Sequence, residues 1–204
     1  MPLVRRDAAG PEPAEGERPQ LGQGGPDERW AAARRLGAAA GDVAILAVAL
    51  KTEPDPRVRE AILTSLARVG NAESLAAVLP LLRSDAADLR TGALDALRAM
   101  AGAVAARLTD LLADPDPDVR LLACELARAI PAERAQQVLC DLIEQDAEVN
   151  VCAAAIEVLA EIGSGEAIPS LDRCARRFPN EAFLEFSIKV TVNRIAARPT
   201  SARG

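Results

Sequence analysis

One segment of about 31 residues recurs along most of this chain, and this repetition constrains the fold more than any other feature. The copies start at equivalent positions, namely Asp55, Asp85, Asp116 and Ala147. The first copy opens with apolar residues spaced to share one face of a helix: Val58, Ile62, Leu66 and Val69. Gly70 and Asn71 then stop that helix, and a second apolar stripe follows. Each copy is therefore predicted to be a pair of helices.

A helix pair leaves its apolar stripe exposed to water unless a neighbouring copy covers it. With a weaker copy over residues 30–50, the period is sustained about five times, which indicates a solenoid. The aspartates before the first helices, such as Asp55 and Asp116, are predicted to cap them. Pro80 falls inside a second helix and predicts a bend there.

The pattern divides the chain into four parts. Residues 1–25 are rich in Pro, Gly, Glu and Gln, and this composition predicts a disordered tail. Residues 26–177 form the repeat array. Residues 178–198 depart from the repeat and are predicted to form a C-terminal capping helix, and residues 199–204 a flexible end.

Composition argues against most catalytic chemistry. Half of the residues are apolar but only 2 % are aromatic, and the chain contains neither His nor Tyr. The commonest general base and every His-containing metal site are therefore excluded. The net charge of -6 argues against nucleic acid as the partner, because phosphate binding needs a positive field. We predict no enzyme activity, no cofactor and no metal.

The cysteines and the apolar runs indicate the cellular compartment of the protein. The four cysteines lie in apolar helical patterns without a C-x-x-C pair, which favours buried thiols in a reducing compartment over a zinc or redox site. The longest apolar run, residues 43–50, is too short to span a membrane. The prediction is a cytoplasmic protein with no membrane contact.

Three arginines recur at equivalent positions of the copies, namely Arg59, Arg90 and Arg120. They would either pair with a nearby aspartate, such as Asp55, Asp85 or Asp116, or form a basic ladder for phosphate. We favour the ion pairs. The acidic run from Asp114 to Asp118 lacks the glycine turn of a calcium loop and is not expected to bind calcium.

Residues 55–59 (DPRVR) and 116–120 (DPDVR) resemble the start of the HEAT-like repeats first described in phycobilisome lyases. The resemblance covers roughly residues 26–177. It implies a right-handed α-solenoid of about five helix pairs that binds other macromolecules on its inner face. It also implies that the recurring Asp and Arg tie neighbouring repeats together, so no catalytic residue follows from it.

The second helices of such arrays line the concave face, and their polar positions are the predicted contact with a protein partner. These positions are Glu73, Arg107, Asp110, Arg134, Gln137, Asp141, Arg173 and Arg177. Mixed charge of this kind is typical of a protein-binding groove, although an ordinary solvated surface looks the same.

The C-terminal helix has an apolar arc wider than an end cap requires. A second contact, either a homodimer or a partner surface, is predicted at Phe183, Phe186, Ile188 and Val192. The alternative is a cap that only seals the last repeat.

Two functions remain open from the sequence. The first is a non-catalytic scaffold or adaptor for protein–protein interaction, for example in bacterial signalling or regulation. The second is an auxiliary lyase or chaperone-like subunit for tetrapyrrole (bilin) attachment, which only the family resemblance suggests and which the scarcity of aromatic residues disfavours.

Overall fold

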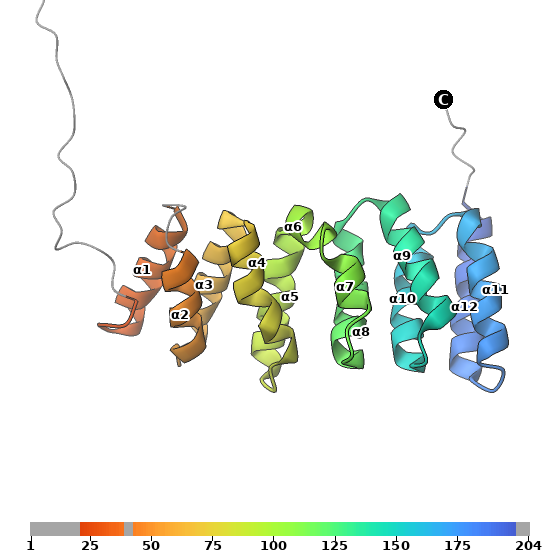
Figure 1. Cartoon of the computed structure of the whole chain (residues 1–204), viewed down its shortest axis with the longest axis horizontal. Coiled ribbons are helices and arrows are strands. Elements are labelled where there is room, and N and C mark those ends of the chain that lie inside the picture. The colour runs from red at the N-terminus through yellow and green to blue at the C-terminus, as the bar shows by residue number, and fades with distance from the viewer. Residues whose placement is uncertain (1–20, 39–42, 199–204) are drawn as a thin grey trace, which may run out of the picture.

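The computed structural model describes residues 21–38 and 43–198, and within them the chain is a row of paired helices (Figure 1). The first helices of the pairs are α1 (Pro26–Ala38), α3 (Pro56–Val69), α5 (Ala87–Ala99), α8 (Pro117–Leu126) and α10 (Val149–Ile162). The second helices are α2 (Val43–Thr52), α4 (Ala72–Val78), α6 (Ala101–Ala105) with α7 (Leu108–Leu112), α9 (Ala132–Gln145) and α11 (Ile168–Arg177). Short 3-10 turns follow α4 and α8 and precede α11, at Leu79–Arg83, Ala127–Ala129 and Gly165–Ala167. Helix α12 (Ala182–Ala196) closes the row.

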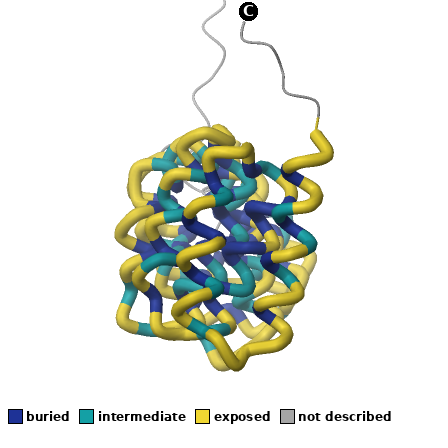
Figure 2. The backbone as a smooth tube through the Cα atoms, turned by 90° about the vertical axis from the view of Figure 1, so that its right-hand side faces the viewer, coloured by how far each residue is buried: buried dark blue, intermediate teal, exposed yellow. Residues whose placement is uncertain are grey.

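The helices form two layers with the core between them. Each first helix packs on the next one, in the order α1, α3, α5, α8, α10, and the second helices cover the same side of this row. The end-on view shows buried positions in the centre and exposed positions outside (Figure 2). The stripe predicted from Val58, Ile62 and Leu66 is fully buried in this core. The predicted all-α solenoid of stacked helix pairs is thereby confirmed.

Helix boundaries follow the local signals of the sequence. Asp55 accepts hydrogen bonds from two amides of the first turn of α3, and Asp116 caps α8 by accepting one, from the amide of Asp118. Gly70 ends α3 in the left-handed conformation, with φ of 62°. Helix α4 ends at Val78, and Pro80 lies in the 3-10 turn that continues it. Asp85, in contrast, does not cap α5 with its side chain.

The ends of the array differ from the predicted boundaries in one respect. Leu21 is only 4 % exposed and belongs to the core, so the packed part of the chain begins before residue 26. The rest of the predicted tail, residues 1–20, and the predicted flexible end, residues 199–204, lie outside the described residues. At the other end, α12 packs on α10 and α11 and buries Leu184, Ile188 and Ile195. No helix among the described residues is long and apolar enough to cross a membrane.

Candidate functional site

The polar residues predicted on the second helices lie on one exposed layer of the molecule. All eight are exposed, and they come from four successive repeats: Glu73 from α4, Arg107 and Asp110 from α7 and the residue before it, Arg134, Gln137 and Asp141 from α9, and Arg173 and Arg177 from α11. Stacking of the repeats therefore aligns side chains that are up to a hundred residues apart in sequence. We call this set the second-helix strip.

Some residues of the strip are already engaged within the protein. Arg107 pairs with Asp110 at 3.0 Å within one turn, and Arg173 pairs with Glu144 at 2.6 Å. The hydrogen bond from Arg173 holds the pKa of the Glu144 carboxyl below its usual value. No ion pair of Arg134 is present within the described part of the chain. Arg134 is therefore the cation of the strip that is most available to a partner.

A groove of about 380 Å³ opens between α7 and α9 in the middle of the strip. Its walls include Thr109, Leu112, Val138 and Gln145, with the exposed carboxylate of Asp141 at its edge. The groove mixes apolar walls with polar rims, as protein-binding surfaces do.

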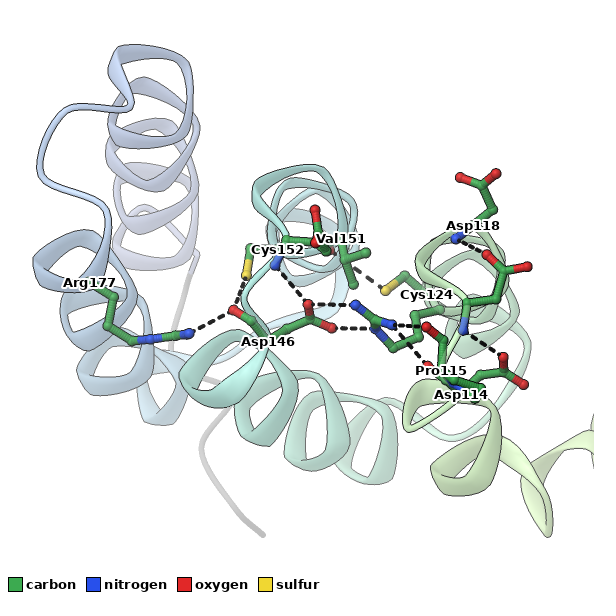
Figure 3. A network of polar contacts seen from close by, with 11 residues as sticks. Asp114, Pro115, Asp118, Cys124, Asp146, Val151, Cys152 and Arg177 are labelled. Carbon is green, nitrogen blue, oxygen red and sulfur yellow. Dashed lines mark hydrogen bonds and ion pairs between the residues drawn. The ribbon is translucent and has the colours of Figure 1, made fainter.

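Asp146 joins two repeats, the pair of α8 and α9 and the pair of α10 and α11, at this groove (Figure 3). Its carboxylate accepts hydrogen bonds from Nε and Nη2 of Arg120 at 2.6 and 3.0 Å, which raises the pKa of that guanidinium. Its backbone carbonyl accepts a hydrogen bond from Arg177 at 2.7 Å. Arg177 also donates to the carbonyl of Ile143 at 2.7 Å. Arg177 is thus a structural residue as well as a member of the strip.

Two of the three recurring arginines bind an acid that lies beyond their own helix pair, not the aspartate that precedes their own helix. Arg59 pairs with Asp88 at 2.6 Å, and Arg120 pairs with Asp146. The expected partners Asp55 and Asp116 instead accept backbone amide hydrogen bonds at helix starts. The favoured ion pairs are therefore present at Arg59 and Arg120, but not with Asp55 and Asp116, because stacking brings another carboxylate closer to each guanidinium.

The basic ladder and the acidic run from Asp114 to Asp118 are both occupied by contacts within the protein. Arg90 donates to the carbonyl of Ser84, so the three guanidinium groups do not form a free basic ladder. In the acidic run, Asp114 pairs with Arg83 and accepts the amide of Asp116. No group of three metal-ligating side chains occurs among the residues that the structure describes.

The cysteines are buried as predicted, except that Cys140 is only half-buried. Burial raises the pKa of the Cys124 thiol to about 12, so this thiol stays protonated at neutral pH. The fully buried Cys152 donates to the backbone carbonyl of Asp146. These contacts are those of small core side chains.

The four residues predicted to form the second contact, all on α12, do not share one exposed surface. Phe183 and Phe186 are 69 % and 65 % exposed and line a groove of about 470 Å³ between α8, α10 and α12. Val192 is half-buried, and Ile188 is buried in the core at 5 % exposure. The predicted second contact therefore reduces to the two phenylalanines, because Ile188 faces α10 and its neighbours.

A further apolar surface was not predicted from the sequence. Helix α2 buries Val43, Leu46 and Leu50 but leaves Ile45 and Val48 at 47 % and 66 % exposure. The sequence does contain a signal for an exposed apolar surface on this helix. Residues 43–50 are apolar without interruption, whereas one buried face of a helix needs only about half of them. A groove of about 870 Å³ runs along this exposed flank.

The chain matches one family of repeats and is distantly similar to several solved structures. The family model described as HEAT repeats matches residues 19–98 and 105–182. A designed armadillo repeat protein is 20 % identical, with 86 % of this chain and 97 % of that chain covered and a TM-score of 0.41. The complex of CpcE and CpcF of phycocyanin lyase from Nostoc sp. PCC7120 is 16 % identical, with 95 % and 100 % covered and a TM-score of 0.40. No curated protein matches the chain. Because the HEAT-repeat model matches well over half of its residues, the chain belongs to the HEAT-repeat family.

Proposed function

We propose that the protein is a non-catalytic scaffold or adaptor that binds another protein through the second-helix strip. The observation that carries the proposal is the exposure of all eight predicted residues on one layer formed by successive repeats. Repeat proteins build extended binding surfaces from such layers, because each repeat contributes a few side chains at a fixed spacing. A role in signalling or regulation is part of the same proposal.

The charge pattern of the strip supports a protein partner over nucleic acid. Acids and bases are interspersed along it: Arg107 pairs with Asp110, and α9 carries both Arg134 and Asp141. A phosphate backbone would meet repulsion from the strip's carboxylates at three of its four repeats, and the chain as a whole is negative. A protein surface of mixed charge can complement this pattern, which would set the register of the two partners.

The test is charge reversal in the strip, measured as retention of a partner by the tagged full chain. A triple variant carries Arg107→Glu, Arg134→Glu and Arg173→Glu. It should no longer capture any protein that the wild-type chain retains from a lysate of its source cells. The matched control reverses three exposed arginines of the first-helix layer, Arg35, Arg57 and Arg68, and should leave capture unchanged. Equal capture by both triple variants would disprove the proposal.

Arg134→Glu alone is the sharpest single variant. Among the residues that the structure describes, Arg134 has no ion pair to lose, whereas reversal of Arg173 also places two carboxylates together at Glu144. A loss of capture by Arg134→Glu with unchanged helical circular dichroism therefore reports binding and not folding.

We also propose that Phe183 and Phe186 form a second contact, with a second copy of the chain as its occupant. Two phenylalanines that are about two-thirds exposed on one flank of α12 support this idea. Phe183→Ser with Phe186→Ser should convert a dimer into a monomer in light scattering, without uncovering the buried face of α12. A wild-type chain that stays monomeric at high concentration would refute the dimer.

A further inference from the structure

The groove of about 470 Å³ beside Phe183 and Phe186 runs over α10 on the first-helix layer of the molecule. Helices α8, α10 and α12 are consecutive in this layer (Figure 1). The middle helix, α10, lines the groove with the small side chains of Ala153 and Ala154, and α8 supplies Leu121 on the far side. The groove is therefore a hollow over α10 beside an apolar ridge on α12. We call Ala153 and Ala154 the α10 hollow, and Phe183 and Phe186 the α12 ridge.

The hollow and the ridge lie on parallel helices. The hydroxyl of Thr191 on α12 donates to the carbonyl of Ile156 on α10 at 3.5 Å. Arg198, which follows α12, donates to the carbonyl of Ala160 near the end of α10 at 2.6 Å. Both helices therefore run in the same direction, with their C-terminal ends together. A two-fold axis between them and parallel to both exchanges their positions, and would place the ridge of each copy in the hollow of the other.

The charges at the rim of the groove obey the same symmetry. Glu157 lies on the α10 side with its side chain 72 % exposed, and its carboxylate is 3.8 Å from Nη2 of Arg128. Arg194 lies on the α12 side, exposed and without an ion pair in the part of the chain that the structure describes.

These two charges also lie at nearly the same level along the helices. Arg194 is about 4.5 Å beyond Thr191 along the helix axis. Glu157 is about 1.5 Å beyond Ile156, the residue that Thr191 contacts. The two-fold axis would therefore bring Arg194 of each copy to Glu157 of the other.

We propose that a second copy of the chain docks in this way. The α12 ridge of each copy lies in the α10 hollow of the other, and two ion pairs between Arg194 and Glu157 flank the axis. This docking geometry rests on the proposed contact at Phe183 and Phe186 and specifies which surface of the second copy meets them.

Area and charge favour a second copy over a single helix of another protein. In the symmetric pair, four phenylalanines that are about two-thirds exposed would bury about 400–650 Å². This is about a third of the total area of a stable interface, about 1,200–2,000 Å². A helix from another protein would cover only two of the four. The rim carries one exposed acid and one exposed base, so it complements its own two-fold copy better than a helix of strong net charge.

The docking leaves the second-helix strip of each copy uncovered, because it uses the first-helix layer. The dimer would therefore carry two strips. A partner with two matching sites would be held more tightly than by one chain, since its second binding event is intramolecular.

Charge reversals at the rim test this geometry, with dimerisation of the full chain measured by sedimentation equilibrium. The homodimers of Glu157→Arg and of Arg194→Glu would each hold two like-charge contacts, so their dissociation constants should rise about tenfold or more. In an equimolar mixture of the two variants, the heterodimer regains both ion pairs. Its dissociation constant should return to within about threefold of the wild-type value. An ion pair within one chain cannot produce this rescue by mixing.

The control Glu185→Arg reverses an exposed charge of α12 outside the groove lining and should leave the dimer unchanged. If Phe183→Ser with Phe186→Ser abolishes the dimer but the two rim variants dimerise like the wild type, the contact stands and this geometry is overturned. A mixture of the rim variants that fails to restore the dimer also overturns it. A wild-type chain that stays monomeric would overturn the contact and the geometry together.

Discussion

The contact between Arg120 and Asp146 offers the sharpest test of how the repeats are held together, and Asp146→Ala is the informative change. The Asp146 side chain is 3 % exposed and the Arg120 side chain 14 %. The carboxylate accepts two hydrogen bonds from Arg120 and one from the amide of Glu148 at 2.9 Å. The Ala variant therefore leaves a guanidinium and an amide of the next helix without their acceptor.

The cost follows from the burial of the pair. Removal of one partner of a buried ion pair costs about 3–5 kcal/mol, because the remaining charge stays desolvated. Arg120 keeps its hydrogen bond to the carbonyl of Asp114 at 2.9 Å, which offsets part of the loss. We expect a decrease of about 3 kcal/mol in the free energy of unfolding, or about a hundredfold in the equilibrium constant.

The matched control is Asp88→Ala, which removes the acid bound by Arg59, the arginine that corresponds to Arg120 two repeats earlier. Asp88 also pairs with an arginine of the preceding repeat, Arg59, but its side chain is 58 % exposed. Water and salt screen an exposed pair, so its removal should change stability by no more than the error of the measurement.

Urea unfolding followed by circular dichroism at 222 nm measures both variants. The m-value serves as a check that the same unit unfolds in each. If Asp88→Ala and Asp146→Ala destabilise the protein equally, or if Asp146→Ala has no effect, burial does not set the strength of these contacts and the reasoning is refuted.

Three further predictions concern acid stability, helix packing and the tetrapyrrole alternative. The hydrogen bond from Arg29 lowers the pKa of Glu53 from 4.5, so this group stabilises the fold above that pH and its contribution is lost as the pH falls through the lower folded value. Urea midpoints should be measured from pH 7 to 3. The midpoint of the wild-type chain should decrease at pH values below 4.5, and that of Glu53→Gln should decrease less steeply. Parallel plots of midpoint against pH for the two proteins would contradict this. Gly37→Ala should destabilise the protein by about 1–3 kcal/mol, because the new Cβ would lie 2.8 Å from the Cα of Ser65 across the contact of α1 with α3. In the control Gly92→Ala, the new Cβ would contact only a movable methyl group of Leu63, so this variant should be neutral or stabilising. A higher urea midpoint for Gly37→Ala than for Gly92→Ala would be inconsistent with the packing described. Titration of a bilin with the protein should leave the absorbance spectrum unchanged, and a shifted band would instead favour the tetrapyrrole function.

Much of the fold was predictable from local sequence signals. The spacing of Val58, Ile62 and Leu66 identifies a buried face, because only a helix brings those positions together. Asp55 and Gly70 mark the two ends of α3, since capping and left-handed turns depend on the residue itself. The repeated period then requires stacking, because an isolated helix pair cannot cover its own apolar stripe.

The functional surfaces were predicted less completely. Exposure of the second-helix strip follows from helical periodicity and was anticipated from the sequence. Ile188 was placed on the surface in error, because the apolar arc of α12 extends beyond one face and the sequence does not say which part meets α10. The exposed flank of α2 was missed for the same reason, since Ile45 and Val48 look like core residues in a continuous apolar run.

The sequence alone therefore determined the helix pairs, their number and their tendency to stack, because these depend on residues close together in the chain. Only the tertiary structure decided which side chains meet across repeats. Arg59 and Arg120 reach the acid of the next repeat, not the aspartate that is nearer in sequence. Among the described residues the same stacking leaves α2 with an apolar flank, because α2 belongs to the first helix pair of the row and only one neighbouring pair packs against it.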